Sequence, residues 1–146
     1  MERERYLADS NESHTLFEFT SKGVKGNIKK IVTYQHWGGN VYNLAFGDYD
    51  NKIGWLNDTS RSNNGDADKV LATVAYTVII FLQHYPDAKI SIQGSTVART
   101  RLYQMQLVLQ IKEISSQYIV EAHINGDWEI FRKGKNYDGF SIRNKK

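Results

Sequence analysis

The sequence predicts an α+β protein: a largely antiparallel sheet with two helices packed on one face, in the order β-β-β-α-β-α-β-β. Short segments with alternating apolar side chains lie near both ends of the chain, and two longer segments between them have helical periodicity. The 146 residues match the usual size of one domain. We therefore expect a single domain over residues 1–146, with frayed ends at about 1–13 and 143–146.

The first three strands are expected near residues 15–19, 28–34 and 42–47. Aromatic residues alternate in the first of these segments, and β-branched residues fill the second. The segment 36–40, His-Trp-Gly-Gly-Asn, has the composition of a turn, because glycine and asparagine tolerate positive φ. Together these segments predict an antiparallel meander.

The two helices are expected at about 66–84 and 96–110. Asp66 is a good N-cap candidate for the first helix, Asp68 lies in its first turn, and Pro86 follows its end. The second helix carries an apolar stripe with helical spacing. The remaining strands are expected at 88–93, 118–124, 128–132 and 140–142.

The composition excludes several classes of protein. The chain has no cysteine, so disulfides, thiolate nucleophiles and cysteine-based zinc sites are excluded. It has no apolar segment long enough to cross a membrane and no secretion signal at its N-terminus, so we expect a cytoplasmic protein without a membrane partner. Basic residues cluster at 22–30, at 99–101 and near the C-terminus, and the net charge is +3. Such clusters are found in proteins with polyanionic partners, but at this net charge a solvated surface is the simpler explanation.

The segment Gly94–Tyr103 carries the clearest indication of a binding site. It leads from a predicted strand through a glycine and two hydroxyl residues, Ser95 and Thr96, into a predicted helix. Free backbone N–H groups and the helix dipole attract anions at such a position. Arg99 and Arg101 lie in the first turns, where cations are unfavourable unless an anion is bound. We therefore expect a phosphate or carboxylate site here.

If both helices lie on one face of the sheet, their N-terminal ends can line a single pocket. We expect catalytic roles for four residues: Asp66, Asp68, Arg101 and Tyr103. We expect ligand-binding roles for five others: Asn63, Asn64, Ser95, Thr96 and Arg99. The structural alternative stays open, in which Asp66 only caps its helix and the carboxylates only neutralise the arginines. No metal site is expected, since the histidines lack ligand spacing, and the sequence does not identify a cofactor.

Three segments of the chain resemble a small bacterial family that is catalogued as a domain of unknown function. They are Val41–Asp48, Asn63–Thr73 and Gly94–Tyr103, and the similarity extends from about Phe17 to Phe140. The resemblance implies a bacterial, cytoplasmic, single-domain protein, and it implies no activity.

Two functions remain open on these grounds. The first is a site for a phosphate-bearing ligand, either a nucleotide or RNA, in a toxin-like or defence-related protein with a small acidic protein partner. The second is a non-catalytic protein-interaction module in which the same motifs are structural. The sequence does not decide whether the protein is an enzyme.

Overall fold

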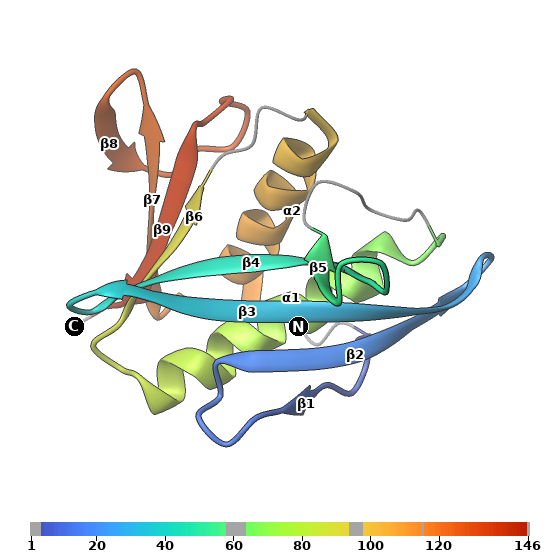
Figure 1. The fold of residues 1–146 in the computed structure, drawn as a ribbon. Coiled ribbons are helices and arrows are strands. Elements are labelled where there is room, and N and C mark those ends of the chain that lie inside the picture. The colour runs from blue at the N-terminus through green and yellow to red at the C-terminus, as the bar shows by residue number, and fades with distance from the viewer. Residues whose placement is uncertain (1–3, 58–63, 94–97, 115, 146) are drawn as a thin grey trace.

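The computed structural model describes residues 4–57, 64–93, 98–114 and 116–145, with the side chains of 57, 98–100 and 114 left aside. Within these ranges the chain forms one mixed sheet and two helices (Figure 1). The strands are β1 Asp9–Ser10, β2 Leu16–Gly23, β3 Gly26–Gly38, β4 Val41–Asp50, β5 Trp55–Asn57, β6 Lys89–Gln93, β7 Tyr118–Ile124, β8 Asp127–Ile130 and β9 Gly139–Asn144. The helices are α1 Ala67–His84 and α2 Ala98–Ile114.

The strand order is β1-β2-β3-β4-β6-β9-β7-β8, and β5 pairs with β4 outside this path. All neighbouring strands are antiparallel except β4 and β6. The predicted α+β class with a mostly antiparallel sheet is therefore confirmed. The last strand of the chain, β9, lies inside the sheet between β6 and β7.

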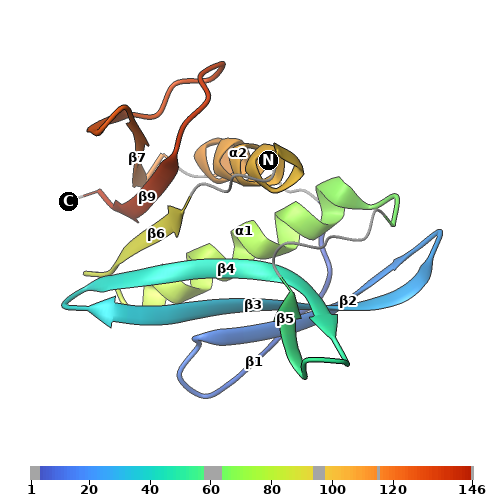
Figure 2. The same cartoon turned by 45° about the horizontal axis from the view of Figure 1, so that its top comes forward.

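The sheet consists of two halves that share only a short contact. β4 and β6 pair in parallel over three residues on each strand, Val41–Asn43 with Lys89–Ser91. Beyond this contact the strands separate: β3 and β4 run across the view, whereas β6, β7 and β9 run steeply upward (Figure 1). Figure 2 shows the same divergence from a second direction, with α1 beside the first half and α2 beside the second.

One hydrophobic core joins the two halves. On β3 and β4 the buried side chains alternate, so that Val32 and Tyr34 face α1 together with Leu44 and Phe46. Phe81 of α1 is fully buried among them. In the second half, the core includes Ile90 and Ile92 of β6, Phe140 and Ile142 of β9, and Leu107, Val108 and Ile111 of α2. Both helices pack against one face of the sheet, but the stripe predicted for the second helix, which includes Leu102, Met105 and Leu109, was wrong in position. Leu102 is 57% exposed, and Met105 and Leu109 are only partly buried.

Two segments differ from the sequence-based expectation. β3 continues through His36 and Trp37 to Gly38, with a bulge between His36 and Gly38, so the turn is confined to Gly39 and Asn40. The N-terminal segment was expected to fray, but from Tyr6 onward it contacts α1 and β2. Its β1 pairs with β2, and the backbone N–H of Tyr6 donates a 2.8 Å hydrogen bond to Thr73 of α1.

Among the described residues, neither α1 nor α2 combines the length and the hydropathy that crossing a lipid bilayer requires.

Candidate functional site

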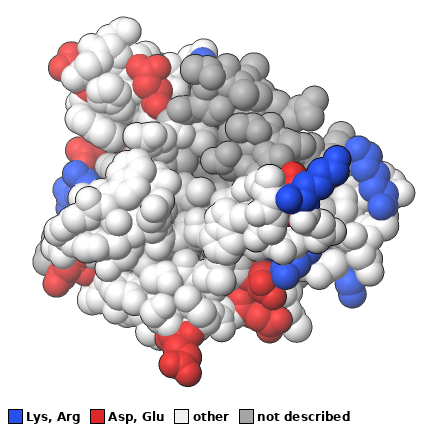
Figure 3. All heavy atoms as spheres, in the orientation of Figure 1, with Lys and Arg blue, Asp and Glu red and all other residues white. Residues whose placement is uncertain are grey.

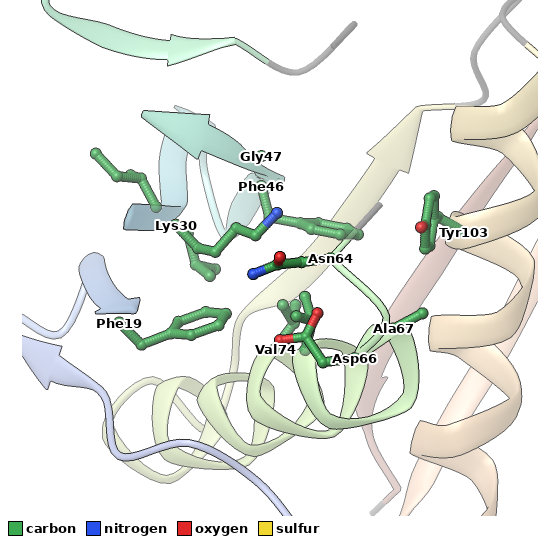
Figure 4. A pocket seen from close by; sticks show the side chains of 12 residues that line it. Phe19, Lys30, Phe46, Gly47, Asn64, Asp66, Ala67, Val74 and Tyr103 are labelled. Carbon is green, nitrogen blue, oxygen red and sulfur yellow. The ribbon is translucent and has the colours of Figure 1, made fainter. Parts of the chain in front are cut away.

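A small polar pocket lies where the two halves of the sheet separate, beside the N-terminal end of α1 (Figure 4). Its volume is about 20 Å³, which is enough for about one water molecule. The described lining is Phe19, Lys30, Ile31, Val32, Phe46, Gly47, Asn64, Asp66, Ala67, Val70, Val74 and Tyr103. Strands β2, β3 and β4 therefore supply one wall, the start of α1 supplies the second, and α2 supplies Tyr103.

The cation of this pocket is a buried lysine. Lys30 lies opposite Asp48 in the β3–β4 register, and the two side chains form a hydrogen-bonded ion pair. Both side chains are largely buried, at 8% and 13% exposure. Because removing either partner leaves the other charge buried and alone, this pair strongly constrains both positions. In Figure 4 the ammonium group of Lys30 points towards Phe46 and Asn64.

Asn64 connects the start of α1 to the turn of the β2–β3 hairpin. Its side-chain N–H groups donate to Ser21 Oγ at 3.0 Å and to the carbonyl of Gly26 at 2.9 Å. Its side-chain oxygen accepts a 2.6 Å bond from the backbone N–H of Lys25, and its carbonyl accepts one from Val24. Since Asn64 is only 2% exposed, these bonds satisfy an amide that would otherwise be costly to bury.

Asp66 occupies the N-cap position of α1, but its carboxylate makes no capping hydrogen bond. One carboxylate oxygen, Oδ2, instead accepts 2.5 Å hydrogen bonds from the hydroxyls of both Tyr6 and Ser21. Burial, and secondly the bond to this carboxylate, raise the pKa of the Tyr6 phenol above its ordinary value. Asp66 thus attaches the N-terminal segment and β2 to the beginning of α1.

The structure brings together three of the residues expected at the site: Asn64, Asp66 and Tyr103 all line this pocket. Asp68 is exposed and Arg101 is half-buried, and neither belongs to the described lining. The remaining expected residues, Asn63, Ser95 and Thr96 together with the side chain of Arg99, lie outside the described part of the chain.

The sequence-based expectation did not include Lys30, Asp48, Tyr6 or Ser21. A signal was present for the first two. Lys30 shares its position in the strand alternation with Val32 and Tyr34, and Asp48 shares its position with Leu44 and Phe46, so both charges were on inward-facing positions. Tyr6 and Ser21 had no comparable signal, because their roles depend on contacts with a helix that begins more than forty residues later.

Exposed lysines lie on the β2–β3 hairpin, near the pocket but outside its described lining. Lys22 and Lys25 are exposed next to the turn that Asn64 holds. Figure 3 shows Lys and Arg side chains gathered at the end of the molecule where this hairpin lies. Among the described residues, no three His, Asp or Glu side chains are grouped in a way that would hold a metal ion.

These features define an α+β protein with a divergent mixed sheet, two helices on one of its faces and a small polar pocket at the start of the first helix. The chain belongs to the family of unknown function DUF6934, whose model matches residues 2–145. The expected similarity to a family without a known activity is thereby confirmed. No curated protein and no solved structure matches the chain.

Proposed function

We propose that the protein binds the phosphate backbone of a nucleic acid, RNA in the first instance, at this pocket and across the lysines beside it. The observation that carries this proposal is the buried Lys30 ammonium. It has three N–H donors, and its one partner among the described residues is Asp48. A phosphate oxygen that enters the pocket can accept one of the remaining donors.

The attraction for an anion comes from the cations beside the pocket, because Lys30 is paired with Asp48 and Asp66 adds a negative charge. The Asp48 carboxylate is paired with Lys30, and the Asp66 carboxylate is stabilised by two hydroxyl donors at the positive end of α1. The exposed side chains of Lys22 and Lys25 add positive charge on the hairpin side. The sequence adds Arg101 in the first turn of α2.

The size of the pocket favours a polymer over a free nucleotide. A volume of about 20 Å³ admits one small group and not a base with its sugar. A nucleic acid can place one phosphate at the pocket while neighbouring phosphates contact exposed cations, which is how sequence-independent binding is achieved. No reaction is proposed, because Asp66 is engaged by two hydroxyls and Asp68 lies outside the pocket lining.

The topology supports the same location. β4 and β6 are parallel, and they separate beyond Asn43 and Ser91 towards their carboxyl ends. In sheets with parallel strands, ligands bind outside the carboxyl ends of the strands at the place where neighbouring connections diverge. Phe46 and Gly47, which line the pocket, lie on the carboxyl-terminal side of this contact.

The test is a fluorescence-anisotropy titration of a short single-stranded RNA at several salt concentrations. We expect the double variant Lys22→Glu/Lys25→Glu to bind at least tenfold more weakly. The slope of its log affinity against log salt concentration should be less negative by about 1–2, because each lost phosphate contact reduces the magnitude of that slope by about 0.7. Arg101→Ala should weaken binding while the protein stays folded.

The matched control is Lys89→Glu/Lys145→Glu, which also reverses two exposed charges, one at the amino end of β6 and one near the C-terminus. We expect it to retain the affinity and salt dependence of the wild type. Equal affinity of the hairpin variant and this control, or no RNA binding at low salt, would contradict the proposal.

A second candidate function is a protein-interaction module, and a specific observation favours it. The polar groups of Asn64 and the Oδ2 atom of Asp66 are engaged in bonds that hold β2, β3 and α1 together. The corresponding partner would be a small acidic protein that covers Lys22 and Lys25, in a bacterial toxin-like or defence system of the cytoplasm. In that case RNA would not bind, and Arg101→Ala would lower the melting temperature by several degrees.

A further inference from the structure

We propose that a groove on the outer face of the second half-sheet binds a planar nitrogen heterocycle of the nucleobase type. The ring stacks on Trp128, and its N–H groups donate to Asp138. This groove shares no described lining residue with the pocket beside α1. The inference therefore does not rest on the function proposed above.

The register of four strands builds the groove. Gln93 of β6 lies opposite Gly139 of β9, Gly139 lies opposite His123 of β7, and His123 lies opposite Trp128 of β8. These residues form one row across the face of the sheet that α2 does not cover, since Ile92, Phe140 and Ala122 of the neighbouring row belong to the core. Gly139, in the middle of this row, has no side chain, and it lines the groove.

The dimensions suit one flat ring. Neighbouring strands lie about 4.8 Å apart, so the backbones of Gln93 and His123, with β9 between them, are separated by about 10 Å. The groove has a volume of about 360 Å³, which lies within the range of small-molecule sites. Its described lining is Ser91, Ile92, Gln93, His123, Trp128, Asp138, Gly139 and Phe140.

The polar side chains of the groove have unused hydrogen-bonding capacity. Gln93 and Asp138 bond to described residues only through their backbone. The Gln93 carbonyl accepts a hydrogen bond from Gln104, and the Asp138 N–H donates to the carbonyl of His123. No hydrogen bond joins the side chains of Ser91, Gln93, His123 or Asp138 to another described residue. This differs from the first pocket, where Asn64 and Asp66 are engaged within the protein. A carboxylate, an amide, an imidazole and a hydroxyl thus line one groove without a hydrogen-bond partner among the described residues.

Trp128 supplies the stacking surface. This tryptophan is 54% exposed, although its side chain is large and apolar. The indole lies against the imidazole of His123, with 5.1 Å between ring centroids and a tilt of 49°. An exposed indole that is held by a neighbour and borders a groove is suited to stacking against the face of a base.

The chemistry of the lining selects the class of ligand. Asp138 only accepts hydrogen bonds and repels anions, so it favours a ligand with N–H donors over a phosphate. Guanine presents a ring N–H and an amino group side by side, which can both donate to one carboxylate. The Gln93 amide both donates and accepts, so it can pair with another edge of the same ring. Guanosine is therefore the best probe, and uridine, with a single ring N–H, should bind more weakly.

The experiment is isothermal titration calorimetry of the full chain with guanosine, uridine, a methyl glucoside and a short guanine-containing single-stranded oligonucleotide. We expect guanosine to bind more tightly than uridine by at least fivefold and the methyl glucoside not to bind. Trp128→Ala and Asp138→Asn should each weaken guanosine binding at least tenfold. Both positions are exposed, so both variants should fold.

Trp37→Ala is the matched control, because Trp37 is an exposed tryptophan, at 46%, outside the groove. It should leave guanosine binding unchanged. The proposal is supported if guanosine or the oligonucleotide binds and Asp138→Asn weakens that binding. If guanosine binds more tightly, the ligand is a free nucleoside; if the oligonucleotide binds more tightly, the ligand is a nucleic acid strand. Three results would overturn it: no guanosine or oligonucleotide binding at millimolar concentration, binding that Trp128→Ala and Asp138→Asn do not change, or equal binding of the methyl glucoside.

Discussion

Burial changes the acid–base chemistry of Tyr34, a core residue of β3. It is 3% exposed, its ring stacks on Phe81 at 4.2 Å, and its hydroxyl lies 2.8 Å from Thr77 Oγ1. Since the Thr77 hydroxyl donates to the carbonyl of Val74, the tyrosine is the donor between them. Burial raises the pKa of Tyr34 far above its ordinary value of 10.0. The phenol therefore stays protonated in the folded protein at any pH in ordinary use.

This shift predicts a loss of stability at alkaline pH. The folded-state pKa is raised, so the stabilisation is complete below pH 10 and is lost as the pH rises above it, by about 1.4 kcal/mol per pH unit. In Tyr34→Phe this contribution is absent. Urea denaturation at pH 8, 10 and 11 should show the wild type losing free energy of unfolding faster than the variant. Parallel pH profiles of the two proteins would contradict the argument.

At the level of elements, the β2–β3 hairpin and the start of α1 depend on a close backbone contact. A Cβ atom on Gly23 would lie 1.9 Å from the carbonyl oxygen of Asn64, where no side chain fits. The same carbonyl accepts the N–H of Val24. A glycine at position 23 therefore allows the hairpin to approach the helix closely enough for the side chain of Asn64 to reach Gly26 and Lys25.

We expect Gly23→Ala to lower the free energy of unfolding by about 2–3 kcal/mol, because the clash is with backbone and cannot be relieved by a rotamer change. Gly39→Ala is the comparison. Its φ is +53° but nothing lies within 4 Å of the added atom, so the cost should be about 1 kcal/mol. Urea denaturation measures both values, and hydrogen exchange at Val24 should accelerate only in Gly23→Ala. A smaller cost at Gly23 than at Gly39 would show that the hairpin can move away.

The elements also show what the sequence could and could not predict. Alternation and helical periodicity identified both helices and most of the strands, because these patterns are local. β1 and β5 were missed because segments of two and three residues carry no period. The insertion of β9 between β6 and β7 depends on non-local pairing, which no local pattern encodes. For the candidate site, the two helix starts indicated Asn64, Asp66 and Tyr103 as neighbours, while the bonds from Tyr6 and Ser21 depend on the assembled sheet.

For the whole molecule, the decisive feature is one core beneath two half-sheets. The halves share only a three-residue strand contact, yet their buried residues form a single cluster that α1 and α2 both join. A continuous core favours cooperative unfolding, even where the hydrogen-bonded connection between the halves is short.

Cooperativity can be measured with the three tryptophans. Trp55 lies on β5 in the first half and Trp128 on β8 in the second. We expect a variant that retains only Trp55 and a variant that retains only Trp128 each to unfold in urea with the same midpoint by fluorescence as by far-UV circular dichroism. A Trp128 signal that changes before the circular dichroism would show that the second half-sheet unfolds separately.

The position of β9 has a consequence for how the protein forms during synthesis. β6 and β7 leave the ribosome before β9, and in the folded protein they are not neighbours, because β9 lies between them. Until β9 has emerged, both strands present open edges in a nascent chain whose first half-sheet can already assemble. We therefore expect the first half to form during translation and the second to close only after β9 has been released, which makes this interval the one in which the nascent protein is most exposed to aggregation.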